Sequence, residues 1–231
     1  MTESEWLSST NTRSLLEYIV QMSPGRKHWL FACACCRSVW HLLSNAAQEF
    51  VEDVERSADG QGTVADLIVR FQGSDPYQHF RPLPIVGGNQ AAEAVRSLSW
   101  PLLSCSSSTG ICEVKGFPFF VGSVSLSSAE ALAKTVSWAE ARNPQADLIR
   151  DVFGNPFRTA AISPSWQKWN DGTVVKIAQV IYEERAFDRL PILADALEEA
   201  GCGDERMLDH GRVLRTHVRG CWLVDGLLGK A

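Results

Sequence analysis

Cysteine and histidine are the side chains of this sequence that are best suited to metal binding or nucleophilic chemistry. Four of them lie near the C-terminus with the spacing C-x7-H-x6-H-x3-C: Cys202, His210, His217 and Cys221. Two thiolates and two imidazoles make a complete tetrahedral ligand set for zinc. His217 and Cys221 are one helical turn apart, so a helix there would place both on one face. The sequence therefore predicts a candidate zinc site formed by these four residues.

The same histidines also have an interpretation that needs no metal. The gaps between the four residues are long and match no common zinc module. In an acidic chain, His210 and His217 are equally suited to cap helix ends or to pair with Asp209 or Asp225. Both interpretations stay open from the sequence, and no cofactor other than zinc is indicated.

A second group of cysteines, Cys33, Cys35 and Cys36, lies in the apolar segment Arg26–Leu43. This segment is predicted to be the buried central helix. On a helix, Cys33 and Cys35 point in nearly opposite directions, so the group cannot chelate a metal by itself. Free cysteine is among the residue types that are most often buried. We therefore expect these thiols to be packing residues of the core.

An enzyme with a cysteine nucleophile is the alternative hypothesis for this group. A nucleophilic thiol needs a histidine within reach, and His28, His41 and His79 are candidates. Nothing in the sequence marks a third group that would orient such a histidine. The chain also lacks the G-x-S-x-G, Walker, G-x-G-x-x-G and H-E-x-x-H patterns. The sequence therefore predicts no catalytic or cofactor-binding residue and favours a protein that is not an enzyme.

The clearest periodic pattern in the chain, between Asp171 and Gly201, predicts two helices that meet at a sharp corner. The predicted buried positions are Val174, Ile177, Ala178, Ile181 and Tyr182 in the first helix and Leu190, Leu193, Ala194 and Leu197 in the second. Asp188 is expected to cap the second helix, with Pro191 tolerated in its first turn. Gly201 is expected to end that helix in the left-handed conformation.

The composition is that of an ordinary globular chain. Of the 231 residues, 45% are hydrophobic and 21% are charged, which argues against general disorder and against a membrane protein. A formal charge of −5 removes the broad electrostatic attraction that nucleic-acid binding requires. The first residues lack the pattern of a secretion signal, and an odd count of 7 cysteines favours free thiols. These features predict a cytoplasmic location.

Helical patterns along most of the chain predict a predominantly all-α protein, folded as an irregular multi-helix bundle in a single domain, 1–231. Within it we expect an N-terminal helical half at 1–72, a loop-rich insertion at 73–127, and a C-terminal helical half at 128–231.

The insertion contains an irregular stretch, Trp100–Ser127, which is expected to form either a short β-hairpin or an exposed loop. Three aromatic side chains are bunched in it, Phe117, Phe119 and Phe120. Exposed apolar patches of this kind mark interaction sites, so these residues are predicted to face a partner. An aromatic plug that closes the helical core is the alternative.

Several long segments resemble a large paralogous family of planctomycete bacterial proteins. They are LFACACCRSVWHLL (30–43), DLIRDVFGNPFR (147–158), YEERAFDRLPILADALEEAGC (182–202) and HVRGCWLVDGLLGK (217–230), together with the start MTE-x-EWL. The resemblance implies a bacterial protein, and it implies no reaction, cofactor or catalytic residue. The stretch Trp100–Ser127 departs from the family pattern, which suggests a variable insertion that faces a partner. Gly211 replaces a second cysteine that relatives often carry beside His210, and this weakens the metal-site interpretation.

Together these features favour a non-enzymatic protein-interaction or regulatory module of the bacterial cytoplasm, with another protein as its partner. An enzyme with a Cys/His active site is one alternative. A zinc-stabilised helical adaptor is the other.

Overall fold

The computed structural model describes residues 1–22, 25–62, 66–67, 80–103, 117–158, 160–213 and 215–230. Regular structure within these ranges is helical, and no strand occurs among them, which confirms the predicted all-α class. The chain divides into two compact units, Met1–Ile149 and Arg150–Ala231. The single domain expected from the sequence stays a prediction.

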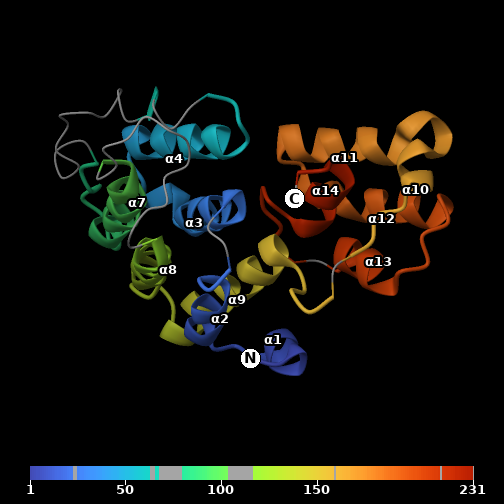
Figure 1. Ribbon diagram of the computed structural model, residues 1–231. Helices are drawn as coiled ribbons and strands as arrows, with labels where there is room; N and C mark the ends of the chain where they lie inside the picture. The colour runs from blue at the N-terminus through green and yellow to red at the C-terminus, as the bar shows by residue number, and fades with distance from the viewer. Residues whose placement is uncertain are drawn as a thin grey trace. The chain divides into compact units, whose positions relative to one another are not determined.

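The first unit is built around helix α3 (Arg26–Ser38), which packs against α4 (Asn45–Ala58), α7 (Gly88–Leu103) and α8 (Phe117–Leu132). Figure 1 shows α4, α7 and α8 arranged around α3. The other α-helices described in this unit include α1 (Glu3–Ser8), α2 (Thr12–Ile19) and the larger part of α9 (Trp138–Phe153). No helix in the described part of the chain is long and apolar enough to cross a membrane.

The cysteines of α3 are core residues, as predicted. Cys33, Cys35 and Cys36 are completely buried, and burial raises the pKa of the thiols of Cys35 and Cys36. Arg37 on the same helix pairs with the buried carboxylate of Glu55 at 2.7 Å. A thiol that stays protonated in an apolar environment is a poor nucleophile, so the raised pKa disfavours Cys35 and Cys36 as nucleophiles.

The predicted irregular stretch Trp100–Ser127 is in part helical, which corrects the sequence-based expectation. Helix α7 continues to Leu103, and α8 begins at Phe117, so the hairpin alternative does not apply to the helical residues. Pro118 is tolerated in the first turn of α8, where its missing N–H would be unpaired anyway. Residues 104–116 and the side chains of Phe117, Phe119 and Phe120 lie outside what the structure describes.

Two serines of α8 have hydrogen-bond partners inside the first unit. The hydroxyl of Ser128 donates to the carbonyl of Val124 at 2.8 Å. The hydroxyl of Ser125 donates to the side-chain oxygen of Gln145 at 2.7 Å, and the amide of Gln145 donates to the Ser125 carbonyl at 2.6 Å. Tertiary packing of α8 against α7 and α3 therefore outweighs the weak helix propensity of its serines.

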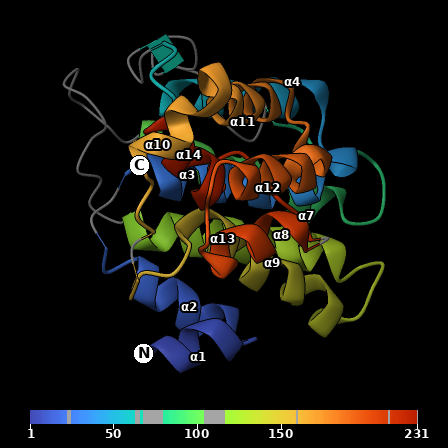
Figure 2. The same ribbon diagram turned by 90° about the vertical axis from the view of Figure 1, so that its right-hand side faces the viewer.

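The second unit contains α10 (Pro164–Lys168), α11 (Thr173–Glu184), α12 (Leu190–Glu199), α13 (Glu205–Arg212) and α14 (Trp222–Leu228), together with the last turn of α9. Figures 1 and 2 both show α11, α12 and α13 one below another. Helix α12 packs against α11 and α13, and α14 packs against α11. These helices enclose one apolar core.

The two predicted helices between Asp171 and Gly201 are α11 and α12. Leu190, Leu193 and Leu197 are completely buried, which confirms the predicted apolar face of α12. Gly201 adopts a φ of +90°, as expected for a left-handed helix end. The predicted cap at Asp188 is wrong, because this residue lies in a 3-10 turn and Arg189 immediately precedes the helix.

Candidate metal centre

Four polar side chains with metal-ligating atoms meet inside the second unit. One nitrogen, oxygen or sulfur atom from each of them lies within 4.8 Å of all the others: Asp151, His210, His217 and Cys221, hereafter the Asp151 cluster. Asp151 comes from the last turn of α9 and His210 from α13. His217 lies in the segment that links α13 to α14, and Cys221 immediately precedes α14.

Gly154 allows the chain after α9 to pack closely against α14. Its φ is +65°, and a Cβ atom at this position would lie 3.0 Å from the indole ring of Trp222. Any other residue would combine backbone strain with this contact. The glycine therefore lets Trp222 approach the helix end that carries Asp151.

Asp151 is the central acceptor of the cluster and is buried. Its Oδ1 lies 2.6 Å from His217 Nδ1 and 3.2 Å from His210 Nε2, and its Oδ2 accepts the backbone N–H of Val218 at 2.9 Å. Burial alone would raise the pKa of Asp151, but the hydrogen bonds from the two histidines outweigh it and lower the pKa. Asp151 is therefore an ionised carboxylate at neutral pH.

Trp222 fixes the orientation of the His210 ring. The indole N–H donates to His210 Nδ1 at 3.1 Å, and an indole nitrogen is only a donor. Burial lowers the pKa of His210, with the hydrogen bond to Asp151 acting in the opposite direction. The neutral ring must then carry its hydrogen on Nε2. This nitrogen faces Asp151 Oδ1 and, also at 3.2 Å, the sulfur of Cys221.

The thiol of Cys221 is not activated for nucleophilic attack. Burial, followed by the negative charge of Asp151, raises the pKa of Cys221 well above its ordinary value. In a nucleophilic triad, the acid and the nucleophile face opposite nitrogens of the histidine. Here Asp151 and Cys221 face the same nitrogen of His210. The completely buried thiol is therefore suited to a metal that displaces its proton and not to a substrate.

His217 contributes one ring nitrogen to the cluster and has a second that is unpaired. Its Nδ1 faces Asp151, whereas its Nε2 is buried and has no hydrogen-bond partner among the described residues. The ring lies edge to face with that of His210, with the centroids 4.8 Å apart.

The structure brings three of the four sequence-predicted ligands together and places the fourth elsewhere. Cys202 is buried outside the cluster, where its sulfur lies 3.9 Å from that of Met207. Asp151 stands beside His210, His217 and Cys221 in its place. Sequence reasoning missed Asp151, and the only signal was its position inside the quoted segment DLIRDVFGNPFR.

Gly211, noted as a departure from the family pattern, is explained by packing. A Cβ atom there would lie 2.9 Å from the Cβ of Ala194 and 3.2 Å from the carbonyl oxygen of Leu190. A side chain at this position would therefore point at α12. The absence of a cysteine beside His210 removes no donor from the Asp151 cluster.

Comparisons with protein-family models, with curated proteins and with solved structures gave no match. What the cluster can do is therefore inferred from its own geometry and chemistry. The resemblance to planctomycete proteins stays a prediction.

Proposed function

We propose that this protein is a non-enzymatic helical module whose C-terminal unit, Arg150–Ala231, is stabilised by one zinc ion. The ligands are the four side chains of the Asp151 cluster. The observation that carries the proposal is that four donor atoms of types that zinc prefers lie within 4.8 Å of one another in a buried position.

The charges of the donor set suit a divalent ion. Cys221 as a thiolate and Asp151 as a carboxylate supply two negative charges, while neutral His210 and His217 supply none. The four ligands would therefore neutralise Zn²⁺, as a buried site requires. Sulfur and imidazole ligands favour zinc over magnesium or calcium, which prefer oxygen.

Two of the distances between ligand atoms already suit a tetrahedral zinc site, whereas others must change by about 1 Å. In a tetrahedral zinc site the ligand atoms are about 3.3–3.8 Å apart. His210 Nε2 already lies 3.2 Å from both Asp151 and Cys221. The 2.6 Å hydrogen bond between His217 and Asp151 would lengthen by roughly 1 Å. Four protein ligands leave no open coordination position, which supports a structural role over a catalytic one.

The module is proposed to act by binding another protein in the bacterial cytoplasm. The unactivated thiol of Cys221 argues against the alternative of a Cys/His enzyme. The described cysteines are all free thiols, as suits a reducing compartment. A net charge of −5 disfavours nucleic acid as the partner. The proposal that Phe117, Phe119 and Phe120 face the partner rests on the sequence.

Metal analysis of protein purified without a histidine tag tests the zinc site directly. We expect one zinc ion per chain by mass spectrometry of the metal content, and a loss of most of this zinc in Asp151→Asn. Asp147→Asn is the matched control, because Asp147 is an exposed carboxylate one turn earlier on α9. Zinc-free wild-type protein that takes up no zinc on titration, or an equal loss in both variants, would contradict the proposal.

Replacing Trp222 by phenylalanine is expected to strengthen zinc binding about fivefold to tenfold, the effect of losing one hydrogen bond in the metal-free state. When Nε2 of His210 binds zinc, the ring hydrogen must move to Nδ1, where it would face the indole N–H. The Trp222→Phe variant removes this conflict and keeps an aromatic ring against Gly154. Competition with a zinc-binding dye measures the change. Weaker zinc binding by the variant would show that His210 does not coordinate through Nε2.

A further inference from the structure

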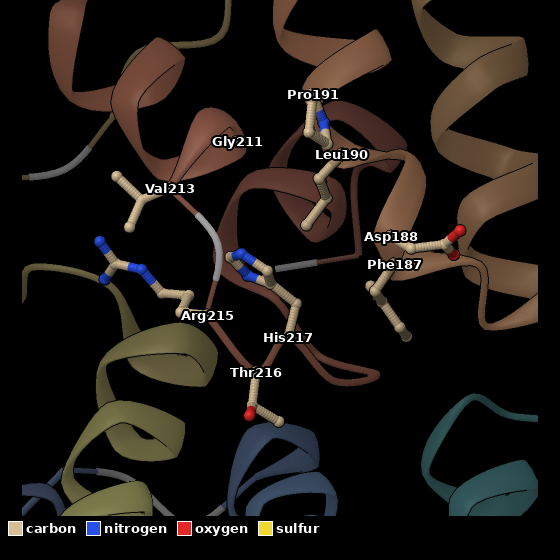
Figure 3. Close-up of a pocket in the computed structure, with 9 residues that line it drawn as sticks. All are labelled: Phe187, Asp188, Leu190, Pro191, Gly211, Val213, Arg215, Thr216 and His217. Carbon is tan, nitrogen blue, oxygen red and sulfur yellow. The ribbon is translucent and has the colours of Figure 1, made fainter.

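A hollow of about 550 Å³ opens in the second unit beside the Asp151 cluster. Its apolar lining comes from Phe187, Leu190, Pro191 and Val213, and its polar lining includes Arg215 and His217. We refer to it as the Leu190 hollow. In Figure 3 the side chain of Leu190 points toward the imidazole of His217, and Val213 and Arg215 lie on the other side of that ring. Hollows of this volume with apolar walls and a few polar groups are typical of small-molecule sites.

The positively charged side chain of Arg215 stands at this hollow. Among the described residues, no carboxylate lies within salt-bridge distance of the exposed guanidinium of Arg215. The nearby Arg212, in contrast, pairs with both Asp195 and Glu198. Asp188 also lines the hollow, but Figure 3 shows its carboxylate directed away from Arg215. The arginine is therefore available to an anionic guest.

The unpaired nitrogen of His217 is the second polar feature. The side chain of His217 is only 4% exposed, its Nδ1 faces Asp151, and its Nε2 has no partner among the described residues. If Nδ1 binds zinc, a step that rests on the proposed function, the ring hydrogen sits on Nε2. Metal-binding histidines commonly donate this second N–H to a carboxylate, a carbonyl or water. None of the described residues supplies an acceptor for His217 Nε2. A guest that offers an acceptor would therefore gain a hydrogen bond from this nitrogen.

We infer that the Leu190 hollow binds a small molecule that has one carboxylate and a short apolar chain. The carboxylate pairs with Arg215 and, after a small movement of the buried His217 ring, accepts a hydrogen bond from its Nε2, while the apolar chain packs against Phe187, Pro191 and Val213. A doubly charged phosphate suits the hollow less, because one cation among apolar walls would leave its second charge without a partner.

Titration with hexanoate, followed by NMR on the ¹⁵N-labelled full-length protein with and without zinc, tests this inference. Saturable binding is expected in the zinc-loaded protein, with a shift of the His217 ring nitrogens, and neutral 1-hexanol should bind about tenfold more weakly. Arg215→Gln should weaken hexanoate about tenfold and leave hexanol unchanged. Arg206→Gln is the matched control, because Arg206 pairs with Asp204 at the start of α13, and it should change neither affinity.

Two results would overturn the inference. Equal affinities for hexanoate and hexanol, or equal losses in Arg215→Gln and Arg206→Gln, would show that no carboxylate is recognised at Arg215. The absence of saturable hexanoate binding, with or without zinc, would show that the hollow is not a site for this class of molecule. The metal content of the same samples is measured separately. Zinc binding without hexanoate binding would therefore reject only this inference. Hexanoate binding by a protein that takes up no zinc would reject the zinc site and the His217 hydrogen bond that depends on it, and would leave the pairing with Arg215.

Discussion

Zinc is expected to raise the free energy of unfolding of the C-terminal unit by about 4 kcal/mol when free zinc exceeds its dissociation constant about a thousandfold. The physical reason is that the ligands meet only in the folded chain, so zinc binds the folded state far better than the unfolded state. Amide hydrogen exchange in α11, α12 and α13, measured with and without zinc, reports this local stability.

Two cysteine variants separate the ligand set seen in the structure from the set predicted by spacing. Cys221→Ser should abolish the increase in stability. Cys202→Ser, which also changes a buried cysteine of the same unit, should keep it. The reverse result would show that Cys202 is a zinc ligand, as the sequence spacing predicts. It would contradict zinc binding by the Asp151 cluster.

Leu193→Ala should lower the free energy of unfolding by about 2–5 kcal/mol, the usual cost of removing a buried leucine side chain. Leu193 is completely buried on α12, in the core that this helix forms with α11 and α13. Denaturation with urea, followed by hydrogen exchange in α12, measures the change. Ile192→Ala is the matched control, because its neighbouring side chain is 57% exposed, and a change within about 0.5 kcal/mol is expected. A similar small change for Leu193→Ala would show that this side chain contributes little to the core.

The apolar face of α12 could be predicted from the sequence because it depends only on the local spacing of apolar residues. The spacing of Leu190, Leu193 and Leu197 defines one helical face, and burial of that face needs no knowledge of its neighbours. Residue types likewise drew attention to His210, His217 and Cys221. Their chemistry was visible in the sequence, although their geometry was not.

Asp151 could not be predicted, because nothing local distinguishes it from the other acids on amphipathic helices. It lies 66 positions before His217, and only the packing of the second unit brings the two together. The same limit explains the error at α8. Bunched aromatic residues with a proline predict an edge strand or a loop when considered alone, whereas the segment from Phe117 is helical and packs against α7 and α3.

The distance along the chain between Asp151 and His217 also sets the order in which the cluster is completed during synthesis. A chain is made from its N-terminus, so Asp151 is present long before His217, Val218 and Cys221. Until these arrive, an ionised carboxylate on the last turn of α9 keeps water around it, and the neighbouring Val152 cannot be buried at no cost. A chain that stops before His217 would therefore leave the Asp151 carboxylate without the hydrogen-bond donors of His217 and Val218 that it has in the folded unit.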